Sequence, residues 1–408
     1  MIGVIFSNMR KASSAERIYF MEKVRQNLEK HMRELCLIAG SRHVGSAGER
    51  MAADYIAKVF AEYGYEPRFE GYPVTGWEFN SFSLYNITEN RPVPAALPCF
   101  FSNAVDVEGE LFWLTAADVA RLEDFPVKDR ICMVECWSGK SNVMGRNKIA
   151  ETLDALGAAA AIFISNVHTS FAPSSKIQRS PFLKKLGACA VSQEGAYDIA
   201  RHKKDTYRLT IDARCFAHKS YNVVATRPGD KGFGVFGAHY DTAPLTQGAG
   251  DNATGTAIVL ELARLLKDEP SGMRLDFAEF SAEEYIPEFL PPGSEDYVKR
   301  HGKNVDWLMN FDDFGLLIGA PEIKISLPDK LPALHSSRYE IIETSTLDGD
   351  DKSFYHAGIP SLWYYDRTPF NQLHTPYDSL DTIDFDKMTD AVMDAVELFK
   401  QLGKSRNM

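Results

Sequence analysis

Hydrophobic and polar residues recur along this chain with two different periods, and the longer period predicts helices. Apolar residues spaced three and four apart mark one face of a helix. This spacing predicts helices over residues 15–38, 47–63, 253–268 and 385–402. In the second of these, Met51, Tyr55 and Val59 form the predicted buried stripe.

The ends of the first two helices carry capping signals. Ser13 and Glu16 have the spacing of a capping box, and Ser46 and Glu49 repeat it. Glycines follow both apolar patterns, Gly40 after the first and Gly64 after the second. A glycine directly after a periodic segment is typical of a helix C-terminus, so both helices are predicted to stop there.

Short apolar runs bounded by turn residues predict the strands. They cover residues 67–73, 81–86, 222–226, 233–238, 274–281, 306–311, 323–327, 339–344 and 361–365. From residue 220 onward the predicted strands alternate with helices. This alternation indicates an α/β domain with a mostly parallel sheet flanked by helices.

The middle of the chain shows a different pattern of residues. Residues 89–98 carry three prolines and are interpreted as a linker, after which a strand (131–134), a helix (147–156) and a second strand (159–165) follow. No cluster of His and acidic residues accompanies them. We therefore expect a discontinuous main domain, residues 1–88 and 216–408, with a smaller α/β or β-rich domain inserted at 89–215.

Composition narrows the function classes. The 408 residues suffice for two or three domains, and a formal net charge of -11 argues against nucleic acid as a partner. No apolar run reaches 18 residues, and the N-terminal MIGVIFSNMRK lacks a charged region before its apolar patch. The six cysteines are scattered without a CxxC, which favours reduced thiols. We expect a cytoplasmic protein without a membrane segment, and the composition leaves oligomer formation open.

Candidate chemistry gathers just after the predicted strands. His239 follows the strand at 233–238, and Asp251 ends the loop beyond it; Glu283 and Glu284 follow the strand at 274–281. Asp312, with Asp313 as a competing carboxylate, follows 306–311, and His374 lies beyond 361–365. Ligand sites of open α/β sheets lie beyond the carboxyl ends of the strands, so these side chains are expected to meet.

Two imidazoles and at least three carboxylates suit two Zn²⁺ ions that share a bridging carboxylate. Zinc lowers the pKa of water to about 7 and polarises a carbonyl, which peptide hydrolysis needs, and a Glu left free of metal can carry the proton. No G-x-S-x-G, P-loop or convincing dinucleotide fingerprint offers a rival chemistry.

At these residues the chain resembles the co-catalytic zinc aminopeptidases, the family that also includes glutamate carboxypeptidase. The stretches that carry the resemblance are GAHYDT (237–242), GAGDNATG (248–255), FSAEE (280–284), NFDDFG (310–315), FYHAGIP (354–360) and HTPYDSLD (374–381). SRHVGSAGERMAADYIAKVFAEYGYE is similar to the opening helix of the family. The middle segment, with DRICMVECWSGK and GAAAAIFIS, resembles more loosely a protease-associated domain that some members insert.

The resemblance implies a role for each matching residue. Asp251 bridges two metals, Glu284 and His374 complete one site, and His239 and Asp312 complete the other. Glu283 is the general base, and Asp241 orients His239. Asp312 is preferred over Asp313 because the family pattern is Asn-x-Asp. The implied cofactors are two Zn²⁺ per chain, with Co²⁺ or Mn²⁺ as alternatives, and the implied substrates are peptides with a free N-terminus.

Fewer residues bear on which end of a peptide is cleaved. Removal of N-terminal residues is the preferred reading; carboxypeptidase or dipeptidase action on the same metals, a glutaminyl cyclase and a non-catalytic binding protein of the same fold are the alternatives. Arg300 and Arg367 are the candidates for binding a terminal carboxylate, and Asp313, Glu288 and Asp366 for pairing with an amine. The aromatic residues expected to line a pocket for an apolar first residue are Trp363, Tyr364, Tyr365 and Phe370.

Overall fold

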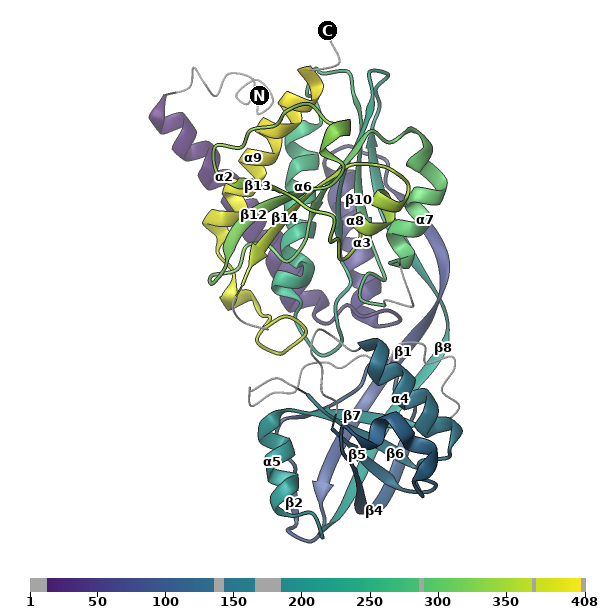
Figure 1. Cartoon of the computed structure of the whole chain (residues 1–408). Coiled ribbons are helices and arrows are strands. Elements are labelled where there is room, and N and C mark those ends of the chain that lie inside the picture. The colour runs from purple at the N-terminus through teal and green to yellow at the C-terminus, as the bar shows by residue number, and fades with distance from the viewer. Residues whose placement is uncertain (1–12, 136–142, 166–184, 286–289, 369–371, 405–408) are drawn as a thin grey trace.

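The structure is a computed structural model of the whole chain, and it describes residues 13–135, 143–165, 185–285, 290–368 and 372–404. Figure 1 shows two lobes joined by a long two-stranded ribbon. We call residues 13–67 and 228–404 the upper lobe and residues 87–205 the lower lobe. Strands β1 (Arg68–Asn86) and β8 (Thr206–Arg227) connect them.

The N-terminal helices follow the predicted capping pattern with two corrections. Helix α2 (Ser14–Arg33) continues into the π-helical turn η2 (Glu34–Ala39), and the Ser13–Glu16 capping box is present in both directions. In α3 (Ala47–Glu62) the Ser46 side chain accepts a hydrogen bond from the Glu49 amide. The Glu49 carboxylate does not complete a box, because it accepts instead from the Gly45 amide at 2.7 Å. Met51 is exposed, so the predicted stripe is wrong at that position.

The upper lobe is built on the mixed α/β sheet that the sequence predicted. Its central strands β9 (Phe233–His239), β10 (Arg274–Phe280), β11 (Trp307–Phe311) and β14 (Ser361–Arg367) are mutually parallel. At one edge β12 (Ala320–Ile325) pairs antiparallel with β14 and parallel with β13 (Glu340–Glu343). At the other edge β8 pairs antiparallel with β10.

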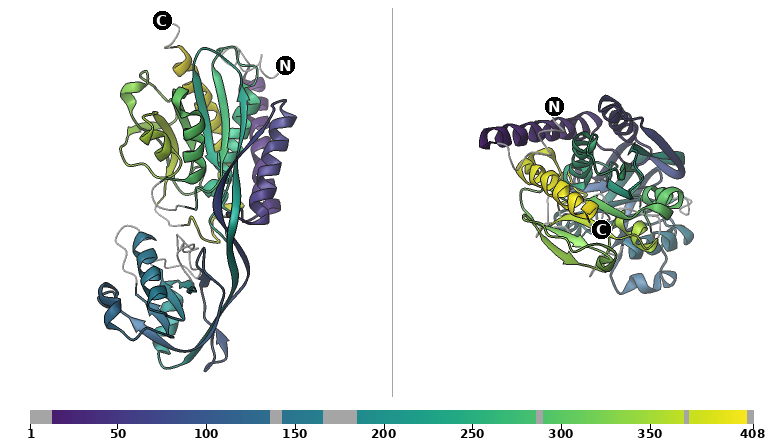
Figure 2. Two further views of the ribbon diagram at one scale, coloured as in Figure 1. Left: turned by 90° about the vertical axis from the view of Figure 1, so that its right-hand side faces the viewer. Right: turned by 90° about the horizontal axis from the view of Figure 1, so that it is seen from above.

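Helices cover both faces of this sheet (Figure 2). The larger core lies between one face and the helices α2, α6 (Thr254–Leu266) and α9 (Phe385–Lys404), with residues such as Phe236, Met309 and Val396 fully or almost fully buried. Side chains one residue along the strands, such as Val235 and Leu308, point to the other face and pack against Tyr297 of α7 (Pro292–His301) and Phe354 of α8 (Asp351–His356). This alternation is what a strand buried on both sides requires. Short helical turns, η6 (Gly302–Asn304), η7 (Pro328–Lys330) and η8 (Leu380–Thr382), lie in the connections.

The ribbon corrects the prediction of separate strands at 67–73 and 81–86. These residues belong to one strand, β1, which pairs antiparallel with β8 from Arg68 opposite Val224 to Asn86 opposite Tyr207. The register shifts once, between Phe79 and Ser81. The predicted strand at 222–226 is likewise the last part of β8. Gly76 lies in the interior of this continuous ladder, between the two predicted strands, where it resembles a turn signal.

The lower lobe continues the sheet. Strand β4 (Val105–Leu114) pairs with β8, and β5 (Ile131–Val134), β6 (Ala160–Ile164) and β7 (Gly187–Val191) follow it in parallel. Helices α4 (Val143–Ala155) and α5 (Gln193–Arg201) and the turn η3 (Asp118–Asp124) accompany these strands. Residues 89–98, predicted as a linker, contain strands β2 (Arg91–Pro92) and β3 (Ala96–Pro98), which pair with β1 and β7.

The two lobes share one apolar cluster. Phe100 and Phe101 of the lower lobe pack with Trp77 of the ribbon and Ala282 of the upper lobe. The Trp77 indole donates a hydrogen bond to the Ser102 carbonyl at 3.0 Å, and the Phe101 ring meets Tyr285 edge-on with ring centroids 5.2 Å apart. Because Ala282 and Tyr285 flank the Glu283–Glu284 pair, the lower lobe packs directly against that loop.

Two smaller expectations concern compartment and thiols. Within the ranges that the structure describes, no helix is both long and apolar enough to cross a bilayer. Cys36, Cys99, Cys132, Cys189 and Cys215 are free thiols, and Cys136 lies outside the described residues.

The assignment of residues 89–215 to a protease-associated domain stays a prediction.

Candidate metal centre

The residue types singled out in the sequence follow the ends of neighbouring strands. His239 is the last residue of β9, and Asp312 comes directly after β11. Glu283 and Glu284 lie three and four residues beyond β10, and His374 lies in the loop that follows β14. Asp251 lies in the π-helical turn η5 (Ala249–Ala253), which leads into α6. Because β9, β10, β11 and β14 run parallel, all these side chains reach the same edge of the sheet.

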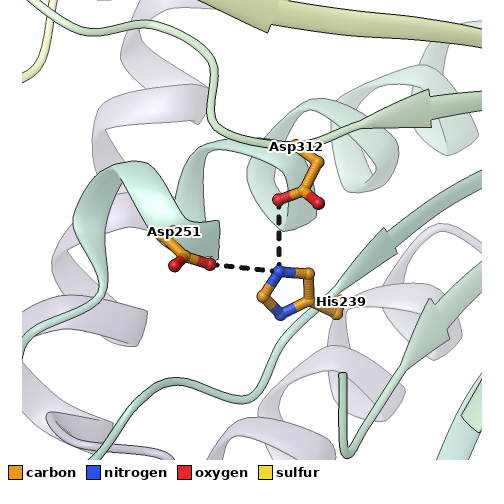
Figure 3. A group of neighbouring side chains, drawn as sticks. All are labelled: His239, Asp251 and Asp312. Atoms are coloured by element: carbon orange, nitrogen blue, oxygen red, sulfur yellow. Dashed lines mark hydrogen bonds and ion pairs between the residues drawn. The ribbon is translucent and has the colours of Figure 1, made fainter. Parts of the chain in front are cut away.

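His239, Asp251 and Asp312 form the first group of potential ligands. The Nε2 atom of His239 lies 3.2 Å from an oxygen of Asp251 and 3.2 Å from an oxygen of Asp312 (Figure 3). All three residues are buried. Donors bound tetrahedrally to one zinc ion at about 2.0–2.1 Å are about 3.3 Å apart, so this spacing fits a single ion.

Asp251, Glu284 and His374 form the second group. The Nε2 atom of His374 lies 2.8 Å from Asp251 and 2.7 Å from Glu284. Asp251 uses Oδ1 toward His239 and Oδ2 toward His374, so its two oxygens face different groups. In each group the ligand atoms of all three residues lie within 4.8 Å of one another. Each group could hold a metal ion, and Asp251 belongs to both groups.

The charges of the site also favour bound cations. Burial disfavours the imidazolium, but the Asp312 carboxylate and the hydrogen-bonded acids around it raise the pKa of His239 well above its usual value. Burial raises the pKa of Asp312, and burial together with the negative charge of Asp251 raises the pKa of Asp313. Carboxylates this close in a buried site repel one another, and divalent cations between them would relieve that repulsion. Nitrogen and oxygen donors of this kind suit zinc and several other divalent metals.

Asp241 joins the strand ends that carry these ligands. Its two oxygens accept hydrogen bonds from the backbone amides of Glu283 and Glu284, each at 3.1 Å. One of the same oxygens lies 3.5 Å from Nδ1 of His239. Asp241 is fully buried, so it holds the imidazole and the Glu pair in one fixed relation. Groups behind metal ligands commonly orient them in this way.

Asp378 plays a comparable part at the bridging residue, and the sequence reasoning missed it. Its carboxylate accepts from the amides of Gly250 at 2.6 Å and Asp251 at 3.2 Å. Burial and the nearby charge of Asp251 raise the pKa of Asp378 to about 7. The only signal in the sequence was an acid four residues after His374 in a loop with Pro376.

Arg42 is a second residue whose role the sequence patterns did not indicate. It is fully buried, and its guanidinium donates to five backbone carbonyls, those of Leu35, Gly40, Tyr240, Gln247 and Gly248. The loop between His239 and Asp251 is therefore fastened to the N-terminal helices. An arginine in SRHVG gives no sequence pattern that would reveal such a role.

The two potential metal sites open into a cleft of about 340 Å³. Glu283 lines the cleft beside the two groups, and Asp313 lines it beyond Asp312. Gly349 closes in from the opposite side with φ +99°, and a Cβ there would lie 3.0 Å from Asp312 and 3.5 Å from Glu283. A side chain at position 349 would narrow the approach to both carboxylates.

The expected aromatic pocket is partly wrong. Trp363 and Tyr365 line the cleft, whereas Tyr364 is fully buried and donates its hydroxyl hydrogen bond to Asp394. Phe370 lies outside the described residues. Side chains alternate along β14, so Tyr364 points to the core and its two neighbours point to the cleft.

Only some of the residues predicted to bind the ends of a substrate line the cleft. Asp366 is buried and accepts from the Leu316 amide, so it is not available to an amine. Arg300 is held by Asp296 and the Gly71 carbonyl, and neither Arg300 nor Arg367 lines the cleft. Glu288 lies outside the described residues. Of the acids proposed for this purpose, Asp313 is the one found in the lining.

Comparison with known proteins places this site in a family. Residues 222–398 match the sequence profile described as Peptidase family M28. This region of the chain is similar to peptidase family M28. The M28 region contains every potential metal ligand named above, from His239 to His374. It also matches Aminopeptidase YwaD of Bacillus subtilis (strain 168), which is 32% identical over 174 residues. That match spans 38% of this chain and 37% of the relative.

Solved structures extend the likeness of the M28 region to nearly the whole chain. A zinc aminopeptidase from Bacillus subtilis superposes with a TM-score of 0.72 at 23% identity, covering 91% of this chain and 94% of that one. The aminopeptidase from Aneurinibacillus sp. strain AM-1 gives 0.66 at 22%, covering 93% of each chain. A peptidase M28 precursor from Shewanella amazonensis SB2B gives 0.73 at 18%, covering 94% of this chain and 95% of that one. At these identities the likeness establishes the fold.

Proposed function

We propose that this protein is a metal-dependent exopeptidase that removes N-terminal residues from peptides, using two divalent metal ions and Glu283 as general base. The observation that carries the proposal is the placement of Asp251, whose two oxygens face two separate His-containing groups. The match to peptidase family M28 supports the reaction class. The similarity to YwaD and to the Bacillus subtilis zinc aminopeptidase supports N-terminal cleavage and zinc.

Five residues of this chain would hold the metals. Asp251 would bridge them, His239 and Asp312 would complete one site, and Glu284 and His374 would complete the other. Bound ions in such a site act as Lewis acids that favour ionisation of a water molecule and polarise the substrate carbonyl. The protein's own contribution is to hold these ligands rigidly, through Asp241, Asp378 and Arg42.

Glu283 is the group we assign to proton transfer. It lines the cleft next to the two ligand groups but belongs to neither. Its backbone amide is fixed by Asp241, so the carboxylate projects from an anchored position. A carboxylate there can take a proton from the attacking water and pass it to the leaving amine.

The acidic lining supports recognition of a free amine. Asp313 lies in the cleft, and its buried Oδ1 atom has no hydrogen-bond partner among the residues that the structure describes. A buried carboxylate oxygen without a partner gains from a positively charged ligand. The free α-amine of a peptide is such a group, and we therefore place the substrate N-terminus on this side of the cleft.

The inserted segment 89–215 is proposed to be a protease-associated domain that shapes access to the cleft. The support is its position against the Glu283 loop through Phe101 and Tyr285. No His and acid cluster with metal-ligand spacing occurs among its described residues, so we assign it no chemistry.

Metal content and two matched substitutions test the proposal. Elemental analysis of protein purified without chelators should give close to two divalent ions per chain. Glu283→Gln should lower kcat by about 10²–10⁴-fold, the range usual for general acid–base catalysis, and should retain both ions. Glu284→Gln, the same change one residue later, should lose metal.

Three results would contradict the assignment. A metal-free protein with full activity would exclude the metals from the reaction. A reversed behaviour of the two Glu variants would exchange their roles. Equal turnover of a leucyl anilide and its N-acetylated form would exclude recognition of the free amine.

A further inference from the structure

One basic side chain in the cleft has no place in the function proposed above. Lys324 lies on β12 directly opposite Trp363 of β14 in the antiparallel register. Its neighbour Ile323 points to the core on the other face of the sheet. Alternation along the strand therefore directs Lys324 into the cleft, where it lines the wall together with Trp363 and Tyr365.

Two aromatic rings hold the Lys324 ammonium in position. Its Nζ atom lies 3.7 Å from the centre of the Tyr365 ring and 4.4 Å from the centre of the Trp363 ring. These are close cation–π contacts, which favour a cation electrostatically but accept none of its hydrogen bonds strongly. The rings therefore fix the ammonium in place and leave its donors available.

The conventional partners of Lys324 are few. Among the described residues, the carboxylate recorded as an ion pair with Lys324 is Glu322, at 3.9 Å, which is beyond hydrogen-bonding distance. No hydrogen bond from Nζ to an acceptor is found in the same ranges. Burial lowers the pKa of Lys324, consistent with an ammonium that has lost water without gaining acceptors. An ammonium has three donors, and here they are left for a ligand.

The other charged groups of the cleft lining are acids, together with the two histidines of the potential metal sites. Asp312, Asp313 and Asp348 line it from the connections after β11 and β13. Lys324 is the one Lys or Arg among the described residues of the lining. The described lining thus combines many acids with a single Lys on β12, and the charges of Asp313 and Asp348 reach that Lys. A ligand that complements both kinds of charge carries a positive and a negative group.

We propose that Lys324 binds a carboxylate of the peptide substrate and so makes the enzyme selective for peptides with a carboxylate close to the scissile bond. This inference rests on the proposed exopeptidase function. Two parts of a substrate supply that chemistry, the side chain of an acidic first residue and the terminal carboxylate of a dipeptide. Either one lies within a few bonds of the free amine that the acids of the cleft would receive.

The proposal changes the expected substrate of the aromatic wall. Trp363 and Tyr365 were predicted to bind an apolar first residue, yet the faces of both rings carry the ammonium of Lys324. An apolar side chain would have to pack against a cation or displace it. A carboxylate would pair with that cation at no such cost.

Substrate pairs that differ in one charge distinguish the two sources of carboxylate. For the side chain, kcat/KM is compared between glutamyl and glutaminyl p-nitroanilides, which are nearly isosteric. For the chain terminus, kcat/KM is compared between Leu-Gly and Leu-Gly-amide. We expect the wild-type, zinc-loaded protein to prefer the carboxylate member of one pair by about 10- to 100-fold, the range of a charge-assisted hydrogen bond.

Two variants assign the preference to Lys324. Lys324→Met keeps an unbranched side chain against the rings but removes the charge, and it should abolish the preference. Lys324→Arg keeps the charge and should retain most of it. A purely structural Lys324 would instead lower turnover of both members of each pair equally, with the ratio unchanged in Lys324→Met.

Binding separates failure of this inference from failure of the proposed function. Calorimetric titration compares glutamic acid 1-amide with glutaminamide, and Leu-Gly with Leu-Gly-amide, on wild type and Lys324→Met. A carboxylate preference that disappears in Lys324→Met upholds the role of Lys324 even if no peptide is hydrolysed. Hydrolysis and binding that ignore the carboxylate in both pairs, or a preference retained in Lys324→Met, overturn it.

Discussion

The upper and lower lobes are built alike and differ in what they bury. Both contain parallel strands accompanied by helices, β9, β10, β11 and β14 in one and β5, β6 and β7 in the other. In the upper lobe Asp241, Glu279, Asp350, Asp351 and Asp378 are completely buried. Among the described residues of the lower lobe no carboxylate is buried, and the core contains thiols and apolar side chains instead.

This difference shows that parallel strand ends alone do not make a site. The lower lobe has parallel strands too, but its described residues include no buried carboxylate. The upper lobe buries many like charges, which is costly unless opposite charges accompany them. The arrangement makes sense when the upper lobe receives cations. The lower lobe then contributes by packing against the loop that follows β10.

The largest effect should come from removing the bridging carboxylate. Asp251→Ala takes a ligand from both groups at once, so we expect loss of both metals and a fall in kcat/KM of at least 10⁴-fold, the whole contribution of the site. Metal analysis and steady-state kinetics measure the two losses. The matched control is Asp106→Ala in the lower lobe, which removes a carboxylate from an exposed pair with Arg208 and should leave both quantities unchanged. Retention of two metals by Asp251→Ala would contradict its bridging role.

A smaller effect is expected where the lobes meet. Phe101 is almost completely buried, stacks on Phe100 and contacts Tyr285. Phe101→Ala should lower the free energy of unfolding by about 3–5 kcal/mol, as large-to-small changes at buried Phe usually do. It should also lower kcat, because the loop of Glu283 loses its support. Phe163→Ala, in the separate core of the lower lobe, should destabilise to a similar degree without changing kcat of the folded protein. Equal kcat in both variants would show that the lobes are functionally independent.

Metal removal should act on one lobe only. Ions that bind the folded upper lobe stabilise it by about 2.7 kcal/mol at a free concentration one hundred times Kd. Calorimetry after chelation should therefore show an unfolding transition moved to lower temperature by several degrees, while a transition from the lower lobe stays in place. Restoring Zn²⁺ should reverse the shift. A thermogram that chelation leaves unchanged would contradict the counter-charge argument.

The smallest predicted effect is a pH dependence of stability in the upper lobe. His31 is buried between the hydroxyls of Tyr55 and Tyr63, at 2.7 and 3.1 Å, and burial lowers the pKa of His31 to about 3. Below about pH 6.5, the ordinary pKa of histidine, His31 binds a proton in the unfolded chain but not in the folded chain. Stability is therefore fully present above that value and falls with decreasing pH, by at most about 1.4 kcal/mol per pH unit.

The substitution His31→Gln tests this linkage. The amide can still hydrogen-bond with both tyrosines but does not titrate. Urea unfolding between pH 7 and pH 5 should show a shallower loss of stability for His31→Gln than for wild type. Parallel curves would mean that His31 is already protonated in the folded state.

Much of the upper lobe was predictable because its signals are local. A buried strand followed at once by His or acid, as in β9 with His239 and β11 with Asp312, is visible in a short window of sequence. The direction of the strands then brings such residues together. The spacing of apolar residues predicted the helices α6 and α9, and a short apolar run predicted the strand β10, each to within a few residues.

What could not be predicted depends on contacts between distant segments. Asp378 and Arg42 act on the backbone of the loop 240–251, and no periodicity records a hydrogen bond to a backbone amide or carbonyl more than a hundred residues away. Lys324 is one polar residue in an ordinary alternating strand until β14 places two rings beneath it. The ribbon was divided into two predicted strands because Gly76 within β1 resembles a turn signal, although pairing with β8 overrides it.

The ribbon has a mechanical consequence. Every covalent path between the lobes is a strand, and the two paths are hydrogen-bonded to each other along nearly their whole length. Such a connection can twist and bend like a beam. It contains no loop that could act as a hinge between the lobes. The register shift between Phe79 and Ser81 interrupts the ladder, and such an irregularity bends and twists its strand locally. Bending there would tilt Phe101 against Tyr285, so a deformation of the beam is transmitted to the loop that carries Glu283.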